Sequence, residues 1–340
     1  MSVEFELAGV GDDAEIQRLL RENPTRGAIS ISLERAPDYF RSVRLPETED
    51  QTIIAREKGC IICMGRCSIR SRYVNGTPRR VGYLSELRLD HTANGRFDVL
   101  RRGYRFFEEL QRQKPADAYF TSIAADNERS RRVLERGLRG MPRYEFVGDY
   151  RTLFVRVRRT SAATETATHA DVPAIREHLN VTNAHRQFSA HWCDQELMAL
   201  SSWNLPPESF QLLRSHGGQV TGCAAVWDQR PFRQVVIRGY SAALRVFRRL
   251  LRLPKAHSVL AQAALVPFSE HLIRRCMADA HTRGIRFLTM GFHAADSGLQ
   301  LARRWFHGRE YRTRLYQVTW PGIATEKLNE LPVAPDFAFL

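Results

Sequence analysis

Long hydrophobic runs are absent from this sequence, and that absence sets the first limits on what the protein can be. No stretch of the chain approaches the roughly 18 consecutive apolar residues that a membrane-spanning helix needs, so no membrane span is expected. The N-terminus, MSVEFELAGVGDDAE, lacks both the basic segment and the apolar core of a secretory signal. We therefore expect a cytoplasmic protein whose six cysteines are reduced thiols.

A metal-binding motif is also lacking. Cys60, Cys63 and Cys67 come close to one, but they lie in a predicted strand. Alternation along that strand would place Cys60 on the face opposite the other two, and no suitably spaced fourth ligand follows. We expect small buried thiols here and no metal.

Lysine is scarce. Only four of the 51 basic residues are lysines, which leaves 47 arginines, and 37 acidic residues give a formal net charge of +14. Such a balance favours anionic partners such as RNA or a phosphorylated cofactor. The arginines are dispersed along the chain, and codon bias in a GC-rich genome would explain the same skew, so RNA binding stays open.

The length of 340 residues predicts two domains. A first order of strands and helices spans residues 1–158, and a similar order returns over residues 171–322. Residues 159–170 are small, polar and typical of a linker, and residues 323–340 form a tail. The sequence does not indicate an oligomeric state.

An insertion in the second half, residues 227–254, stands apart from this repeat. Its pattern predicts a basic amphipathic helix, with Leu244 and Phe247 on one face and Arg245 and Arg248 on the other. The polar residues at its beginning could bind an acceptor: Trp227, Asp228, Arg230 and Arg233.

The most informative stretch is residues 82–104, GYLSELRLDHTANGRFDVLRRGY. It begins with the period of two that is typical of a strand, passes through a polar turn containing Gly95, and continues with apolar residues at helical spacing. A strand, a glycine-containing loop and a helix together offer backbone N–H groups and a helix N-terminus to an anion such as a phosphate. A second strand and helix follow over residues 118–137, and then come Pro142 and Tyr144.

This order of elements resembles the GNAT acyltransferase superfamily over roughly residues 3–158. The resemblance implies an α/β (α+β) fold of two tandem GNAT-like domains, each with a mixed, mostly antiparallel sheet flanked by helices. It implies that Glu86 is the general base and that the backbone of Leu87, Arg88 and Leu89 pairs with the pantetheine arm of acetyl-CoA or another acyl-CoA.

The same resemblance implies a pyrophosphate-binding loop at Asn94, Gly95 and Arg96, with Asn127 beside the cofactor. Arg131 is a candidate phosphate ligand. The tyrosine that many members use as general acid corresponds to Leu134, so Tyr144 or Tyr104 is the candidate acid in its place. The family's two loop glycines correspond to Phe97 and Val99.

We therefore expect an N-acyltransferase, with acetyl transfer from acetyl-CoA to a small-molecule or peptide amine in the N-terminal half. Desolvation of Glu86 on a half-buried strand should raise its pKa and make it a proton acceptor. The alternatives are an aminoacyl-tRNA-dependent transferase and a non-catalytic RNA- or protein-binding module on the same scaffold. The second half has no counterpart of Glu86 and is expected to be structural or to line an acceptor cleft.

Overall fold

Strands and helices follow one another along both halves of the chain. The computed structural model describes residues 3–24, 29–93, 95–160, 162, 165–246, 254–306 and 308–340. The first half contains β1 (Glu4–Leu7), α1 (Asp13–Glu22), β2 (Ile29–Arg35), α2 (Tyr39–Val43), β3 (Glu49–Glu57), β4 (Cys60–Val74), β5 (Thr77–Leu89), α3 (Phe97–Gln113), β6 (Ala118–Ala124), α4 (Glu128–Leu134) and β7 (Arg143–Arg156). The second half contains α5 (Val172–Asn183), α6 (Asp194–Ala199), β8 (Phe210–Arg214), β9 (Val220–Trp227), β10 (Arg233–Tyr240), α7 (Ala242–Val246), β11 (Gln262–Val266), α8 (Ile273–Thr282), β12 (Phe287–His293), α9 (Ser297–Trp305) and β13 (Arg309–Thr319). Within the described ranges, no helix combines the length and the apolar character needed to span a bilayer.

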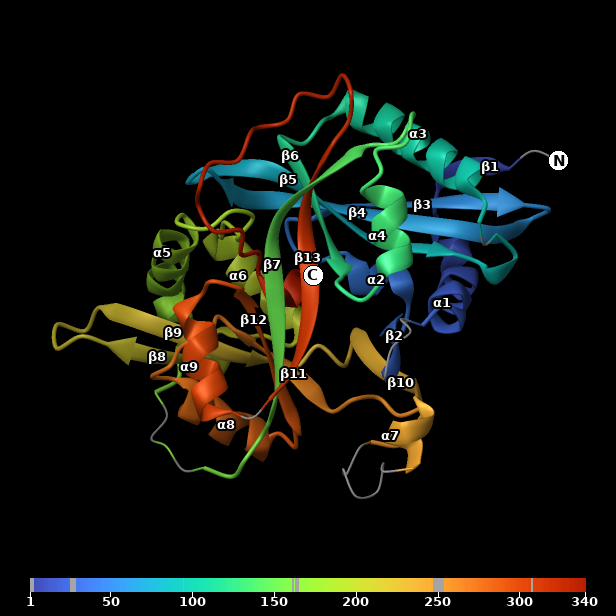
Figure 1. The fold of residues 1–340 in the computed structure, drawn as a ribbon. Helices are drawn as coiled ribbons and strands as arrows, with labels where there is room; N and C mark the ends of the chain where they lie inside the picture. The colour runs from blue at the N-terminus through green and yellow to red at the C-terminus, as the bar shows by residue number, and fades with distance from the viewer. Residues whose placement is uncertain are drawn as a thin grey trace.

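One sheet of eleven strands runs through the molecule in the order β1-β3-β4-β5-β6-β13-β7-β12-β11-β9-β8 (Figure 1). Its neighbouring strands are antiparallel except for two parallel pairs, β5 with β6 and β11 with β12. Those two pairs occupy corresponding places in the two halves. The expected α/β architecture with a mixed, mostly antiparallel sheet is confirmed.

The last strands of the two halves are exchanged. β13, from the second half, pairs with β6 on one edge and with β7 on the other. β7, from the first half, in turn pairs with β12. Figure 1 shows β7 and β13 side by side down the middle of the molecule. The repeat of element order read from the sequence therefore does not produce two separately closed sheets.

Helices cover both faces of the sheet in the first half. Neighbouring residues of β3 point to opposite faces: Ile54 packs with Ile16 of α1, whereas Ile53 packs with Phe107 of α3. Phe107 also stacks against Trp320, with ring centroids 5.1 Å apart. The two faces are called the α1 side and the α3 side below.

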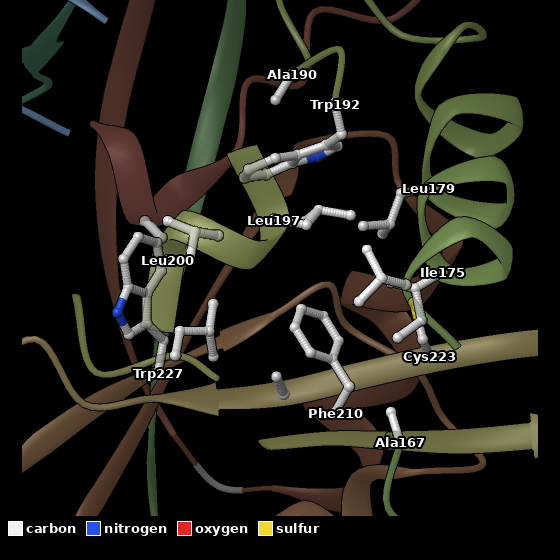
Figure 2. Packing of buried hydrophobic residues seen from close by; sticks show 14 of the residues in the cluster. Ala167, Ile175, Leu179, Ala190, Trp192, Leu197, Leu200, Phe210, Cys223 and Trp227 are labelled. Atoms are coloured by element: carbon white, nitrogen blue, oxygen red, sulfur yellow. The ribbon is translucent and has the colours of Figure 1, made fainter. Parts of the chain in front are cut away.

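The second half has its own apolar core. Figure 2 shows side chains of α5, among them Ile175 and Leu179, and of the α6 region converging on Phe210 and Trp227. Both aromatic residues are buried, and the indole N–H of Trp227 donates to the carbonyl of Trp203 at 2.7 Å. This core fixes β8 and β9 at the far edge of the sheet.

A small second sheet joins the two halves on the α1 side. β10 pairs antiparallel with β2, and Val235 and Ile237 lie opposite Leu33 and Ile31. Residues 233–240 of the insertion form a strand that the sequence did not predict, because the partner of this strand, β2, lies far away in the chain. A helix follows only as α7, and residues 247–253 lie outside the described part of the chain.

Residues 323–340 pack across both halves. Glu326 pairs with Arg79 at 2.9 Å, and its backbone N–H donates to Asp117 at 3.0 Å. Further on, Val333 and Ala338 are buried in separate clusters. This segment, expected as a tail, therefore forms part of the folded core.

The exchange of β7 and β13 leads to a testable expectation. Cleavage at a protease site placed in residues 159–164 should leave the two fragments associated, because each contributes a strand to the other's part of the sheet. Native gel filtration should show one species of intact size, and urea should separate and unfold both fragments in a single transition. Fragments that separate in native buffer would contradict the exchange.

Candidate functional site

The parallel strands β5 and β6 separate partway along their length. They pair only from Val81 with Ala118 to Leu84 with Thr121. At the point of separation the hydroxyl of Thr121 donates to the carbonyl of Leu84 at 2.7 Å. Beyond it, β5 continues beside β4 and β6 continues beside β13, so a gap opens between residues 85–89 of β5 and the end of β6.

A β-bulge lies in the same segment of β5. Arg66 of β4 faces Ser85 and Met64 faces Arg88, so two residues of β5, Glu86 and Leu87, oppose one residue of β4. Glu86 has a φ of 54°, which lies in the left-handed region.

The register after the bulge aims two amides into the gap. The N–H of Asp90 donates to Ile62 of β4 at 2.8 Å. Because alternate residues of an antiparallel strand bond to the same neighbour, the N–H groups of Leu87 and Leu89 point away from β4 and toward the gap. They are suited to bind carbonyl oxygens of an extended ligand lying beside β5.

A cavity of about 440 Å³ reaches the gap from both sides of the sheet. Its lining on the α3 side is mainly apolar and includes Leu84, Leu87, Val99, Leu100, Ile123 and Leu134. Its lining on the α1 side, beneath β2 and β10, is rich in arginine and includes Arg35, Arg66, Arg70, Arg72, Arg88 and Arg233. A ligand threaded through the gap would therefore meet an apolar compartment at one end and a cationic compartment at the other.

Glu86 lies on the α1 side of this cavity in a buried ion pair. Its Oε1 accepts from Nε of Arg35 at 3.0 Å and from a second nitrogen of that guanidinium, and its Oε2 accepts from the hydroxyl of Tyr39 at 2.8 Å. Burial acts to raise the pKa of the Glu86 carboxyl, but the charges of Arg35 and Arg66 outweigh it and lower the pKa to about 2. The expectation of a raised pKa was wrong, and a carboxylate held in this way is a weak proton acceptor.

Tyr144, the candidate acid, lies on the other side of the sheet. Its hydroxyl is 2.5 Å from that of Tyr104, and both residues pack in the cluster around Leu134. Burial raises the pKa of Tyr104 to about 12 and that of Tyr144 well above its usual value, so both phenols stay protonated. The structure therefore places Glu86 and Tyr144 in one cavity but on opposite faces of the sheet.

The candidate phosphate ligands have other partners. Arg96 binds both carboxylate oxygens of Glu57, at 2.9 and 3.0 Å. Arg131 donates to the carbonyl of Ala125 at 2.8 Å. The loop glycine, Gly95, has a φ of 88°, which favours glycine, and an added Cβ there would meet no atom within 4 Å.

Asn127 lies closer to the cavity than those residues. It lines the cavity with Ser130, and its side chain caps α4 by accepting from the N–H of Ser130 at 3.2 Å. Gly95, Arg96 and Arg131 are outside the described lining, and Asn94 lies outside the described residues.

Three cavity arginines were missed from the sequence. Arg66, Arg70 and Arg72 lie on one face of β4 and are all buried. The guanidinium of Arg70 lies over the rings of Trp192 and Phe339 and pairs with Glu196. Arg66, Arg70 and Arg72 are separated by even numbers of residues in an otherwise apolar strand, so the sequence already places them on one face. Burying a charged side chain costs free energy, and three such residues on an inward face therefore indicate a functional site.

Comparisons with known proteins bear on the fold alone. No protein-family model matches the sequence, and no curated protein matches it. Among solved structures, a GCN5-related N-acetyltransferase (GNAT) from Sphaerobacter thermophilus is 14% identical, with a TM-score of 0.55, over 95% of this chain and 98% of that one. The N-myristoyltransferase of Saccharomyces cerevisiae with bound myristoyl-CoA is 11% identical, with a TM-score of 0.60, over 98% and 83%.

A tandem GNAT protein from the clavulanic acid biosynthesis pathway is also similar. It is 10% identical, with a TM-score of 0.56, over 95% of this chain and all of that one. At these identities the similarity shows architecture, and the expected GNAT fold in tandem is confirmed.

The ion pair of Glu86 makes a testable prediction about stability. Glu86→Gln should cost about 3–5 kcal/mol of unfolding free energy at pH 7, because it leaves Arg35 buried without its carboxylate. The measurement is urea unfolding, with Glu177→Gln, an exposed site on α5, as the matched control.

The same pair predicts a pH dependence. The pKa of Glu86 is lowered from 4.5 to about 2 on folding. Its contribution is therefore fully present above about pH 4.5 and is lost as the pH falls from there to about 2. Glu86→Gln should lack this part of the acid dependence. A variant as stable as the control, with the wild-type acid profile, would show that the pair does not form.

Proposed function

We propose that this GNAT-fold protein is an N-acyltransferase that transfers the acyl group of an acyl-CoA to an amine. The observation that carries the proposal is the gap between β5 and β6, with two strand amides that point away from β4 into it and one cavity that reaches it from both sides of the sheet. A thioester in this gap would lie along residues 85–89, so the reacting centre belongs to the first half of the chain.

The chemistry follows from those amides. An N–H of Leu87 or Leu89 would donate to the thioester carbonyl and stabilise the negative charge that forms on its oxygen when the amine attacks. The new C–N bond forms and the C–S bond breaks, and CoA leaves as a thiolate that needs little help from an acid. The protonated phenols of Tyr104 and Tyr144 lie on the α3 side, where they can donate to a ligand but are weak acids.

Glu86 takes a different part in this proposal from the one that the resemblance implies. With its pKa near 2 it does not remove the proton of an ammonium group at neutral pH. We assign it a positioning role, in which it holds Arg35 and Tyr39 at the wall of the cavity, and the acceptor loses its proton to solvent.

The α3-side compartment supports an acyl chain longer than acetyl. It is lined by apolar side chains from β3, β5, β6 and α3, and the Tyr104–Tyr144 pair also belongs to its lining. Acetyl needs little of this space, whereas a longer chain would bury its methylenes there. The yeast N-myristoyltransferase, which shares the fold, was solved with myristoyl-CoA bound.

The RNA-based alternatives gain less support from the structure. Some exposed arginines are used in surface ion pairs, such as Arg132 with Glu128 at 2.5 Å and Arg303 with Glu310 at 2.6 Å. The arginines that lack carboxylate partners include buried residues of the cavity, which a folded RNA cannot enter.

The decisive test of donor and chain length is binding and turnover with a series of acyl-CoAs from two carbons upward. Each added methylene should improve affinity about fourfold, since burying one contributes about 0.8 kcal/mol, until the chain reaches the tyrosine pair. Calorimetry gives affinity, and a thiol reagent reports released CoA. A series in which acetyl-CoA binds as well as every longer chain would contradict the compartment's role, and no binding by any member would remove the acyl-CoA proposal.

A substitution in α3 sharpens the same test. An added Cβ at Gly103, which lines the cavity, would lie 3.3 Å from the ring of Phe5. Gly103→Val should fill part of the compartment and move the preferred chain to a shorter length, without loss of helix propensity because valine is a better helix former than glycine. The control is Arg105→Val, which adds valine to the exposed face of the same helix.

A further inference from the structure

Buried polar atoms without hydrogen-bond partners gather around one cavity. Among the described residues, nine carry such a side-chain atom, and six of the nine line the cavity that meets the β5–β6 gap. The six are Arg70, Arg72, Ser85, Arg88, Gln262 and Thr313. Most of these atoms are donors, and buried donors without acceptors are costly, so their concentration in one place indicates a ligand rich in acceptors.

The lining of the cavity also carries an excess of positive charge, which likewise favours an anionic ligand. Seven arginines line the cavity, and Glu86 is the one acidic residue in its described lining. Four of the arginines have a carboxylate within ion-pair distance: Arg35 with Glu86, Arg66 with Asp50, Arg70 with Glu196, and Arg230 with Asp228.

The other three arginines, within the described structure, donate to backbone oxygens, one of which belongs to Leu340, the last residue of the given sequence. Arg72 donates to Phe188 at 2.9 Å and Arg88 donates to Leu87 at 2.9 Å. Arg233 donates to Ala338 at 3.1 Å and to Leu340. Burial lowers the pKa of Arg72 to about 9, that of Arg233 to about 10, and that of Arg88 below its usual value. An anion in the cavity would stabilise the charged form of these arginines and so counteract the lowering of their pKa values by burial.

Arg88 is the cavity arginine that belongs to the segment of β5 beside the gap. It directly follows Leu87, whose N–H points into the gap, and it pairs with Met64, which packs on the α1 side. The side chain of Ser85 lies on the same side of β5, and Thr313 and Tyr311 of β13 line the opposite wall. Burial raises the pKa of Tyr311 to about 12, and the charge of Arg88 is close enough to act on that pKa in the opposite direction.

We propose that the acceptor is an amine that also carries an anionic oxygen group, a carboxylate or a phosphate, which Arg88 binds together with the hydroxyls of Ser85 and Thr313. This inference rests on the proposed acyl transfer and names its substrate class. The acyl chain would enter from the α3 side and the acceptor from the cationic α1 side, so that its amine meets the thioester in the gap.

The test uses matched acceptors that differ only in the anionic group. Glycine is compared with glycinamide for a carboxylate, and phosphoethanolamine with ethanolamine for a phosphate, by released CoA with the full chain and its best acyl-CoA. We expect kcat/KM at least tenfold higher for the charged member of one pair, which also identifies the group. Equal use of charged and neutral members in both pairs would overturn the proposal.

Variants of Arg88 localise the effect. Arg88→Gln should raise KM for the charged acceptor at least tenfold while leaving the neutral acceptor and the Kd for acyl-CoA unchanged, and Arg88→Lys should recover part of the loss. Arg274→Gln, on the exposed face of α8, is the matched control. An equal loss with charged and neutral acceptors would mean that Arg88 acts on folding or on the donor instead.

A measurement without turnover separates this inference from the proposed function. Acetate and inorganic phosphate are added at a fixed ionic strength set with chloride, and the Tm is recorded. One of the two should raise the Tm of wild type and Arg274→Gln more than that of Arg88→Gln. An Arg88-dependent Tm shift in a protein that does not bind acyl-CoA would support the anion site and contradict the proposed acyl transfer. Acyl transfer in a protein without any Arg88-dependent Tm shift would contradict the anion site alone.

Discussion

The pairing of β13 with both β6 and β7 is the constraint on which the rest of the structure depends. β6 is held by β13 on its outer edge, and β5 is held by β4 on its own. Neither strand can therefore turn to close the space between residues 85–89 and the end of β6. The gap is therefore already open in the folded protein, and ligand binding does not spend free energy on separating the two strands. The same exchange brings β11, β12 and β13 to the walls of a cavity whose reactive part lies in the first half.

Buried charge explains why this cavity has two different ends. Removing an arginine from water is costly, and four of the cavity arginines offset that cost with carboxylate partners. Glu86 is one of those partners, which is why its pKa falls when burial alone would raise it. The unmatched arginines keep a cationic compartment on the α1 side, while α3 supplies an apolar compartment on the other. We infer that the two substrates of the proposed reaction are sorted by this difference.

The strands and helices that form the site could be predicted from the sequence. The alternation of residues 82–89 and the helical spacing that follows predicted β5 and α3, and the runs after residue 118 predicted β6 and α4. Those signals are local, because each depends on a period within one element. The strand exchange could not be read in this way, since β6, β7 and β13 pair over long separations and both halves show the same order of elements. Strand β10 of the insertion was not predicted, because its pairing with β2, more than 190 residues away, decides the conformation there.

Side-chain roles were harder to predict than elements. The position of Glu86 followed from the resemblance, but its ion pair with Arg35 joins β5 to β2 and is invisible in either segment alone. The sequence could have predicted that three arginines of β4 share one face, because even spacing along a strand puts side chains on the same side: Arg66, Arg70 and Arg72. The roles of Leu87, Leu89 and Asn127 stay proposals.

Hydrogen–deuterium exchange with and without a bound acyl-CoA tests the central claim most directly. The amides of Leu87 and Leu89 point into the gap, so the account predicts that a peptide covering residues 85–89 becomes protected when the acyl-CoA binds. The corresponding strand of the second half, β11, should show no such change. Protection of β11 instead, or unchanged exchange over residues 85–89 in a protein saturated with acyl-CoA, would contradict the assignment of the β5–β6 gap as the donor site.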